Sequence, residues 1–377
     1  MNQTHEQSFT EVIDPVPHSV FQISIKTAAH LTWSVTALIG IPANLFVLAA
    51  IVYFRDMRTI SNIYIFNLAV ADLLFLCGIP VSLFGRTARD GWVWGPVMCK
   101  LYISGNAVSQ FASAVFIAIL SCDRYLAVCR PIQSKSFRTT QAALVLSVGA
   151  WIMVIIEMTP LFLFVKLIKS SSGGGSCMLF VGNVTVLESE NEINVTVLNE
   201  IEQNMLASRR FFTSYTFALS YLIPLVTVWY FYFKIIQKMC QRKRQMQTKR
   251  TGTKKRTTKV TIMGLAIVIS YTLCWLPFWI VQWSIEANLF QKSKFLLFCS
   301  THFAFALQYI NSAANPFLYV FLSDSFQKNI QKLLRTAKPD KQNTVKNGNE
   351  PLDTSRMLTV TTNPLCSSST SESHYSC

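Results

Sequence analysis

Long apolar stretches separated by short polar segments make up most of the chain. Seven of these stretches reach or exceed about 20 residues, the length that a helix needs to cross a lipid bilayer. They cover residues 31–53, 62–85, 97–129, 141–165, 211–236, 260–283 and 295–322. The pattern predicts an all-α membrane protein, with a seven-transmembrane helix bundle at residues 31–322 after a polar tail at residues 1–30.

A different periodicity follows the last apolar stretch. In residues 323–337, apolar positions such as Phe326 and Ile330 recur at helical spacing with basic residues between them. This spacing predicts a short amphipathic helix on the membrane surface. Residues 338–377 are polar and predict a disordered cytoplasmic tail. Near its end is a hydroxyl cluster that suits phosphorylation. The cluster consists of Ser367, Ser368, Ser369, Thr370 and Ser371.

Charge sets the orientation of the predicted bundle. The chain is 51% hydrophobic and only 14% charged, with a net charge of +15. Its basic residues are concentrated in short segments, which argues against nucleic-acid binding. With the N-terminus outside, the inner segments hold 22 Lys and Arg and the outer segments nine. This asymmetry predicts a multi-pass plasma-membrane protein with an extracellular N-terminus. Ten of the 22 lie in residues 237–259, which favours contact with anionic membrane lipid and a cytosolic partner.

The outer segments carry candidate modification sites. Three glycosylation acceptor patterns fall on the external side. They begin at Asn2, Asn183 and Asn194. Because the exterior is oxidising, cysteines there are expected to pair. Cys99 and Cys177 are the natural pair, since a bond between them ties loop 166–210 to a helix end. Cys299 is a third candidate.

Loop 166–210 allows two interpretations. It holds five glutamates between residues 188 and 202 and no Lys or Arg from 171 to 208. The loop is either a solvated, glycosylated segment or an attractor for a basic ligand. Its Gly/Ser run at residues 170–176 indicates a flexible spacer.

Asp72 is an acid in the middle of a predicted span, where a charge is costly and usually lines an internal functional site. Its candidate partners are Ser113, Asn311, Ser312 and Asn315. Pro277 and Pro316 interrupt helical bonding within the membrane and predict hinges.

Two other protein classes fit the spans poorly. A transporter or channel would need inverted repeats or several charges along a path. An enzyme would need a nucleophile beside a base, or a metal-ligand spacing. Neither pattern is present in the spans, and the cysteines lack a CxxC spacing that would indicate zinc.

Several motifs in order resemble a known family. Asp72, the triplet Asp123-Arg124-Tyr125, the motif CWLP at 274–277 and the motif NPFLY at 315–319 resemble the rhodopsin-like (class A) G-protein-coupled receptors. The stretches NIYIFNLAVADLLF, SCDRYLAVCRPI and FLSDSFQKN, with Trp92-x-Trp94-Gly95, resemble the somatostatin/opioid group of peptide receptors. Among that group, invertebrate allatostatin-C receptors are the nearest relatives that the resemblance suggests.

The resemblance implies a coupling site for a heterotrimeric G protein. Asp123 would pair with Arg124 at rest, and Arg124 would turn toward the G protein on activation. The chain has Thr257 where many relatives have an acid that holds this arginine, and Thr261 is a substitute partner. The other implied switch residues are Tyr125, Tyr232, Asn315, Pro316 and Tyr319. The tail hydroxyl cluster would then meet a receptor kinase and arrestin.

The resemblance also implies two internal sites and no enzyme cofactor. An allosteric sodium ion would be held by Asp72, Ser113, Asn311, Ser312 and Asn315. A packing switch would consist of Ala114, Pro224 and Tyr271, where relatives have a larger aliphatic residue, a proline and a phenylalanine.

The residue at position 106 narrows the predicted class of ligand. Amine, opioid and vertebrate somatostatin receptors resemble one another in having Asp there, whereas Asn106 is neutral and cannot pair with a ligand ammonium. Residues 295–327 contain no Lys, which excludes a retinal photoreceptor. The predicted ligand site comprises Asn106, Gln110, Trp275, Trp279, Gln282, Gln308 and Tyr309.

The resulting prediction is a receptor for a small, disulfide-closed neuropeptide, similar to somatostatin or allatostatin C, that signals through an inhibitory Gi/o protein. The alternatives within the receptor class are an opioid- or galanin-like peptide receptor, or an orphan receptor.

Overall fold

The computed structural model describes residues 18–87, 92–169, 175–179, 209–245, 252–290 and 293–336. The three predicted glycosylation sites, the acidic part of loop 166–210 and the tail hydroxyl cluster lie outside these residues. The chain divides into two units, Met1–Gln331 and Lys332–Cys377. Of the second unit only residues 332–336 are described, and the account below concerns the first.

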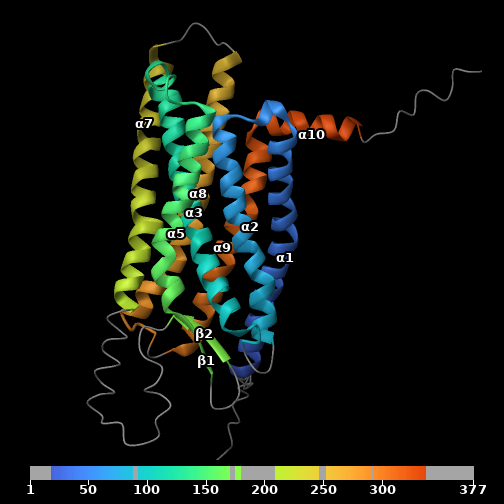
Figure 1. The fold of residues 1–377 in the computed structure, drawn as a ribbon, viewed down its shortest axis with the longest axis vertical. Coiled ribbons are helices and arrows are strands. Elements are labelled where there is room, and N and C mark those ends of the chain that lie inside the picture. Colours follow the sequence, from blue (N-terminus) through green and yellow to red (C-terminus); the bar gives the residue numbers. More distant parts are fainter. Residues whose placement is uncertain are drawn as a thin grey trace, which may run out of the picture. The chain divides into compact units, whose positions relative to one another are not determined.

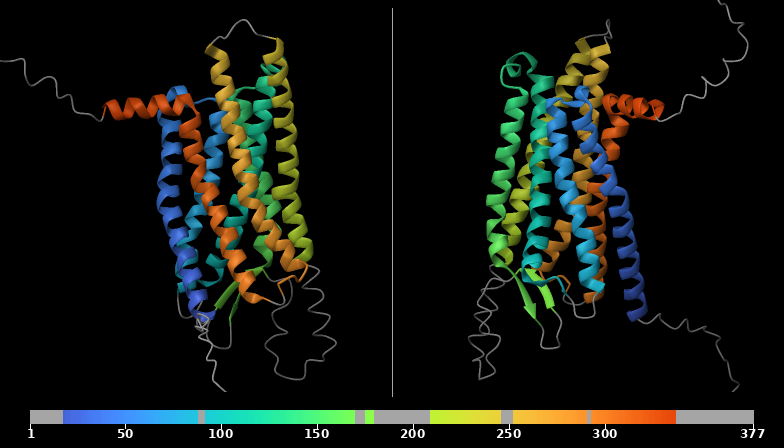
Figure 2. Two further views of the ribbon diagram at one scale, coloured as in Figure 1. Left: turned by 180° about the vertical axis from the view of Figure 1, so that it is seen from behind. Right: turned by 45° about the vertical axis from the view of Figure 1, so that its right-hand side comes forward.

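Seven long helices lie side by side along one axis (Figures 1 and 2). They are α1 (His18–Tyr53), α2 (Ile60–Thr87), α3 (Gly95–Cys129), α5 (Thr140–Phe164), the helical segment Arg209–Gln245, α8 (Gly252–Glu286) and α9 (Lys294–Leu322). The segment Arg209–Gln245 contains a π-helical turn, η3 (Ala218–Leu222), followed by α7 (Ile223–Gln245). The predicted seven-helix bundle is confirmed. Several helices run a turn or more beyond the predicted spans because their polar ends continue the helical hydrogen bonding.

Three shorter elements complete the described helical structure. The 3₁₀ turn η1 (Arg55–Met57) and the one-turn helix α4 (Pro131–Ser134) connect long helices at one end of the bundle. The helix α10 (Asp324–Thr336) follows α9. We call this end of the bundle, where α3 finishes, the Arg124 end, and the opposite one the disulfide end.

The hydropathy of the seven helices is uneven. Six of them are long and apolar enough to cross a membrane by length and composition, and among the described residues α9 is the long helix outside that set. Its polar side chains are buried inside the bundle. They include His302, Gln308, Asn311, Ser312 and Asn315. The seventh helix is therefore held by interior polar contacts as well as by its apolar surface.

A β-hairpin at the disulfide end differs from the sequence-based expectation. Strands β1 (Val165–Lys169) and β2 (Gly175–Leu179) pair antiparallel, with Leu167 opposite Cys177. The predicted Cys99–Cys177 disulfide is confirmed and ties β2 to the first turns of α3, while Cys299 is a free cysteine. Gly175 and Ser176 of the Gly/Ser run therefore belong to a paired strand, which the loop composition did not predict.

Two prolines leave carbonyls unbonded inside the bundle, and neighbouring helices satisfy both. A proline has no N–H, so the carbonyl four residues earlier loses its helical partner. For Pro316 that carbonyl belongs to Ser312, and Asn44 of α1 donates its amide Nδ2 to it at 3.1 Å. For Pro224 it belongs to Ser220, and the Tyr271 hydroxyl of α8 donates to it at 2.6 Å. In lipid such side-chain donors replace the water that would otherwise solvate the carbonyl.

A glycine allows α1 and α9 to approach closely at the same level. A Cβ added at Gly40 would lie 2.8 Å from the Ala313 Cβ and 2.8 Å from Leu76 Cδ1. Small residues let helix backbones pack tightly in membranes. This approach brings Asn44, one turn further along α1, within reach of the Ser312 carbonyl.

We expect Asn44→Ala to lower the melting temperature of the purified receptor by several degrees. The substitution leaves the Ser312 carbonyl unpaired in apolar surroundings, which costs about 1–3 kcal/mol. Thr32→Ala on the same helix is the control, because the Thr32 hydroxyl donates to the Ala28 carbonyl of its own helix. Thermal melting of both variants checks this, and equal melting of the two variants would contradict it.

Candidate functional site

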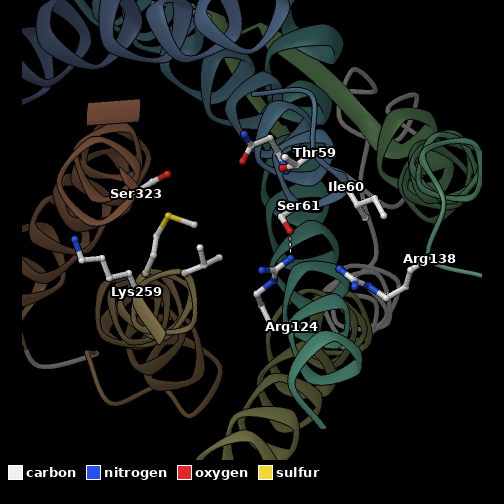
Figure 3. A pocket seen from close by; sticks show the side chains of 10 residues that line it. Thr59, Ile60, Ser61, Arg124, Arg138, Lys259 and Ser323 are labelled. Atoms are coloured by element: carbon white, nitrogen blue, oxygen red, sulfur yellow. Dashed lines mark hydrogen bonds between the residues drawn. The ribbon is translucent and has the colours of Figure 1, made fainter. Parts of the chain in front are cut away.

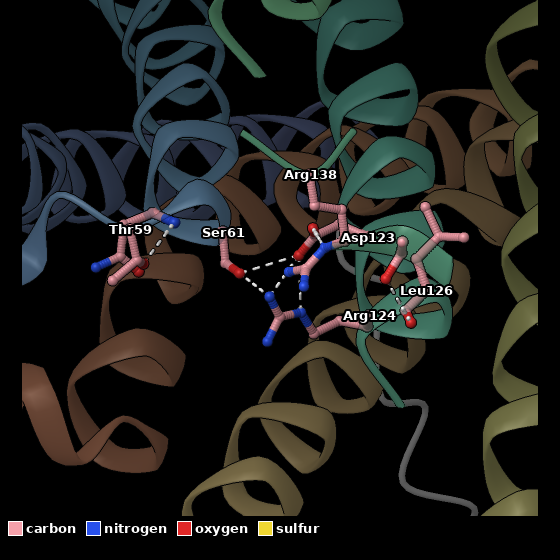
Figure 4. A network of polar contacts seen from close by, with 8 residues as sticks. Thr59, Ser61, Asp123, Arg124, Leu126 and Arg138 are labelled. Carbon is pink, nitrogen blue, oxygen red and sulfur yellow. Dashed lines mark hydrogen bonds and ion pairs between the residues drawn. The ribbon is translucent and has the colours of Figure 1, made fainter. Parts of the chain in front are cut away.

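A buried carboxylate with three partners lies at the Arg124 end (Figure 4). The Asp123 side chain is 4% exposed. Arg124 donates from Nε to its Oδ2 at 3.1 Å and also forms an ion pair with it. Arg138, which precedes α5, donates from Nε to Oδ1 at 2.8 Å. The Ser61 hydroxyl of α2 donates to Oδ2 at 3.0 Å, and Arg124 donates in turn to Ser61.

The sequence predicted the Asp123–Arg124 pair, and the structure places it as expected. It also adds Arg138 and Ser61, which sequence reasoning missed. With the second guanidinium, Asp123 has two cationic partners. If Arg124 moved away, Arg138 would still neutralise the buried carboxylate. The available signal for Arg138 was its place in the basic second inner segment, but sequence alone did not give its distance from Asp123.

A cavity of about 270 Å³ opens beside this network. Figure 3 shows Lys259 and Ser323 on one side of it and Ser61 and Arg124 on the other. Most of the residues in its described lining are polar or basic, and they come from the start of α2, from α3, from the segment before α5, from α8 and from the end of α9. The lining residues are Thr59, Ile60, Ser61, Asn62, Arg124, Arg138, Lys259, Val260, Met263 and Ser323. An acidic or C-terminal group of a partner would be attracted to such a cavity.

Two of the three predicted switch tyrosines, Tyr232 and Tyr319, lie buried near this end. The Tyr232 side chain of α7 is fully buried, and its hydroxyl fills the space that Gly264 of α8 leaves, since a Cβ there would collide with it. The Arg124 Cγ lies 4.0 Å from the same point. Tyr319 is also fully buried, and its hydroxyl has no hydrogen-bond partner among the described residues. The Tyr232 phenol is therefore close to Arg124, and the Tyr319 phenol is available for a new contact after a rearrangement.

Two further residues of the predicted coupling site, Tyr125 and Thr261, have different surroundings. Tyr125 packs its ring on Phe231 of α7, with centroids 5.3 Å apart. Thr261 is buried on α8, and Arg124 donates to Asp123 and Ser61. The side chain of Thr257 lies outside the described residues.

A second buried carboxylate lies deeper in the bundle. Asp72 on α2 is fully buried, and Asn315 donates from Nδ2 to its Oδ2 at 2.8 Å. Asn311 is bonded through its Oδ1 to the Ser270 hydroxyl at 3.1 Å. Ser113 is buried on α3 and Ser312 on α9.

Three acceptor atoms in this part of the bundle are unpaired. Among the described residues Asp72 Oδ1, Asn315 Oδ1 and Asn44 Oδ1 are buried without a hydrogen-bond donor. Buried oxygens without donors, one of them on a carboxylate, form the donor set that a hard cation requires. The residues present therefore fit a small hard cation such as sodium.

Most of the predicted ligand residues lie in or beside an aromatic cluster in the half of the bundle near the disulfide end. The Tyr309 ring lies 4.8 Å from that of Phe75, which in turn lies 6.0 Å from Trp275. Trp279 packs edge-on to Phe217 at 5.1 Å. These rings position two indole N–H groups inside the bundle.

The unpaired atoms of this region are donors, the reverse of those around Asp72. Trp275 Nε1, Trp279 Nε1 and Gln308 Nε2 are buried without an acceptor among the described residues. The region can therefore bind a ligand that presents several carbonyl oxygens, as a peptide backbone does.

The other three polar residues of the predicted ligand site, Asn106, Gln110 and Gln282, have different surroundings. Gln110 donates to the Ser220 hydroxyl at 3.1 Å. Asn106 lies against α2, where its Oδ1 would be 2.6 Å from a Cβ at Gly78. Gln282 is half-buried on α8, and no hydrogen bond of its side chain connects it with these residues in the described part of the chain.

The predicted packing switch has a hydrogen bond that its usual phenylalanine would lack. Ala114 is fully buried, and Tyr271 bonds the Ser220 carbonyl freed by Pro224. Its ring lies 5.9 Å from Trp275, which connects the switch to the aromatic cluster. The tyrosine therefore bonds a carbonyl of the π-helical turn that precedes Pro224.

A third buried carboxylate, Glu286, was missed by sequence reasoning. It ends α8 with a side chain 5% exposed, and Arg209 donates from Nε to its Oε1 at 3.0 Å. Arg210 lies 3.9 Å away, and the Thr213 hydroxyl donates to Oε1 at 3.3 Å. The cluster ties the start of segment Arg209–Gln245 to the end of α8. Opposite charges at two helix ends were the available signal, but only the fold brings them together.

Comparison with known proteins identifies the family. The family model described as 7 transmembrane receptor (rhodopsin family) matches residues 43–319. Somatostatin receptor type 1 of Rattus norvegicus is 31% identical over 305 residues, which cover 80% of this chain and 70% of that receptor. Somatostatin receptor type 2 of Sus scrofa is 30% identical over 319 residues, covering 83% and 79%. Melanin-concentrating hormone receptor 1 of Mus musculus is 29% identical over 345 residues, covering 91% and 90%.

The chain therefore belongs to the rhodopsin family of seven-transmembrane receptors, and it is a multi-pass membrane receptor and not an enzyme. Within the family, the predicted resemblance to the somatostatin/opioid-type group is confirmed. The more specific link to invertebrate allatostatin-C receptors stays a prediction.

We expect Glu286→Gln to destabilise the disulfide end. The change removes the counter-charge of two arginines that are 45% and 59% exposed, and water compensates part of the loss, so we expect about 1–2 kcal/mol. Thr213→Val removes only a neutral donor and should cost less.

Thermal melting of the purified variants provides the measurement. Lys294→Gln is the control, because Lys294 is an exposed charge at the same end. Melting of Glu286→Gln at the temperature of the control would show that the cluster contributes nothing.

Proposed function

We propose that this chain is a plasma-membrane receptor with an extracellular N-terminus that binds a small disulfide-closed peptide and activates a heterotrimeric G protein of the inhibitory Gi/o class. The observation that carries the proposal is the buried Asp123–Arg124–Arg138 cluster at the edge of the 270 Å³ cavity. This cluster offers an arginine that can move from an internal carboxylate to an incoming partner.

The proposed coupling step is a change of partner for Arg124. In the described state its guanidinium bonds Asp123 and Ser61. Arg138 keeps the carboxylate paired when Arg124 leaves, which lowers the cost of stranding a buried charge. If α8 moves outward, the cavity widens and Arg124 can meet the carboxyl-terminal segment of a G protein. Ligand binding favours this state only by its differential affinity for it.

The ligand assignment rests on the donors in the other half of the bundle. Buried N–H groups of Trp275, Trp279 and Gln308 suit the carbonyl groups of a peptide turn. Asn106 offers a neutral amide at the position where an aspartate would favour a ligand with an ammonium group. The names of the similar receptors refer to somatostatin and melanin-concentrating hormone. An allatostatin-C-like peptide fits the neutral position 106.

The orientation follows from charge and from the disulfide. The segments at the Arg124 end carry most of the basic residues, which supports a cytoplasmic location for this end. The Cys99–Cys177 bond favours an oxidising exterior at the opposite end. The tail residues 367–371 would then be accessible to a receptor kinase and to arrestin.

The fit around Asp72 supports an allosteric sodium ion. Asp72, Asn315 and neighbouring Ser113, Asn311 and Ser312 would hold it, and the ion would neutralise the carboxylate and stabilise the resting packing of α2, α3 and α9.

Purified receptor reconstituted with Gi and Gs proteins provides the functional test. Nucleotide exchange is measured with disulfide-closed peptides of the somatostatin, melanin-concentrating hormone and allatostatin-C types, and with linear opioid and galanin peptides. We expect exchange on Gi with a disulfide-closed peptide. Asn106→Asp should shift the potency of that peptide several-fold at equal surface expression. A response only to linear peptides would overturn the ligand class, and exchange with no G protein would overturn the function.

We expect Asp72→Asn to abolish the sodium dependence of agonist binding. The neutral amide lacks the charge that holds a cation, so agonist affinity in sodium chloride should equal that in choline chloride. Wild-type receptor should bind agonist several-fold more weakly in sodium. Asp56→Asn is the control, because Asp56 bonds Asn329 at 3.2 Å and lies outside the centre. Equal sodium sensitivity of Asp72→Asn and wild type would contradict the site.

A further inference from the structure

A second cavity at the Arg124 end is surrounded by positive charge. It has a volume of about 210 Å³ and lies between the end of α3 and the facing side of α7. Figure 1 shows these two helices reaching the same end of the bundle. Its described lining has three cations and no carboxylate. The lining consists of Tyr125, Cys129, Arg130, Lys234, Gln237, Lys238 and Gln241.

Packing between α3 and α7 fixes the walls of this cavity. The Tyr125 ring packs on Phe231, and the Cys129 thiol donates to the Lys234 carbonyl at 3.7 Å. Lys234 and Lys238 are four residues apart, so they project from one face of α7. Both side chains are half-buried. The cavity is therefore an open site between two packed helices, with the half-buried Lys234 and Lys238 at its wall and the exposed Arg130, Gln237 and Gln241 at its rim.

The charges around the cavity lack an internal counter-ion. Arg242 continues the line of Lys234 and Lys238 on α7 and acts electrostatically on the Cys129 thiol together with Lys238 and Arg130. No carboxylate in the described part of the chain forms an ion pair with any of these four cations. The nearby Asp123 is already paired with Arg124 and Arg138. Like charges at this spacing repel one another unless an anion lies between them.

The depth of the cavity indicates where that anion comes from. The apolar spans of the two helices end at Cys129 and Arg242. The cavity therefore lies where the chain leaves the apolar layer, at the level of lipid headgroups. Basic pockets between transmembrane helices at this level bind phosphate-bearing headgroups.

We propose that this cavity binds the phosphomonoester headgroup of an anionic membrane lipid. A phosphomonoester carries a charge of about −1.5 to −2 and three acceptor oxygens, which matches a cluster of four cations better than the single charge of a phosphodiester or a carboxylate. Gln237 and Gln241 add amide donors for the remaining oxygens. The bound headgroup would hold the ends of α3 and α7 together beside Tyr125, independently of the identity of the peptide ligand.

The test uses the full-length receptor in nanodiscs. The first arm contains phosphatidylcholine with phosphatidylinositol 4-phosphate. The second contains phosphatidylserine at the same total surface charge, and the third contains phosphatidylcholine with soluble inositol phosphate added. Retention of a fluorescent phosphoinositide and the melting temperature are measured. We expect tight retention and a raised melting temperature only in the first arm.

Lys234→Gln combined with Lys238→Gln is the test variant. Because each lysine near an anionic surface contributes about fivefold in affinity, the pair should lose about tenfold or more in phosphoinositide binding. Lys328→Gln is the matched control, since Lys328 is an exposed cation of α10 outside the cavity. Arg130→Gln, on an exposed residue of the rim, replaces the double variant if that variant fails to fold.

Three results would overturn the proposal. The first is equal stabilisation by phosphatidylserine and phosphatidylinositol 4-phosphate at equal charge. The second is equal loss of binding in the Lys328→Gln control and in the cavity variant. The third is binding of the soluble inositol phosphate without a response to the lipid, which would assign the cavity to a soluble phosphate.

Discussion

A carboxylate that cannot reach water has to find its counter-charge inside the protein, and Asp123 has two cationic partners. The charge pair with Arg124 would by itself fix both residues, because removing one partner strands the other in a low-dielectric site. Arg138 changes this balance, since it bonds the other carboxylate oxygen at 2.8 Å. Arg124 is therefore the exchangeable member of the cluster, and it lines the cavity where a cytoplasmic partner would enter.

The same requirement to satisfy polar groups internally organises the rest of the bundle. Carbonyls freed by Pro316 and Pro224 are bonded by Asn44 and Tyr271, which tie helices together at the positions where each proline weakens its own helix. Some buried polar atoms remain unpaired. Asp72 Oδ1 and Asn315 Oδ1 are acceptors that suit a cation, and the N–H groups of Trp275 and Trp279 are donors that suit peptide carbonyls.

The sequence predicted the features that depend on composition or on residues adjacent in the chain. The seven spans, the Cys99–Cys177 pair and the Asp123–Arg124 pair follow from hydropathy, from the few cysteines on one side and from neighbouring positions. It did not predict contacts set by helix rotation and approach, such as Arg138 with Asp123 or Glu286 with Arg209. The pairing of β1 with β2 was not predicted, because the glycines and serines of this segment do not specify strands.

The central claim is that releasing Arg124 from Asp123 opens the Arg124 end. Thr140 of α5 and Ile262 of α8 are both exposed and can be replaced by cysteines that carry spin labels. Double electron–electron resonance then measures the distance between these helices. Agonist with nucleotide-free G protein should lengthen this distance by several Å. Arg138→Gln should reduce this lengthening, because without Arg138 the release of Arg124 strands the buried Asp123 carboxylate. An unchanged distance in the wild-type receptor, or equal lengthening in the Arg138→Gln variant, would contradict the account.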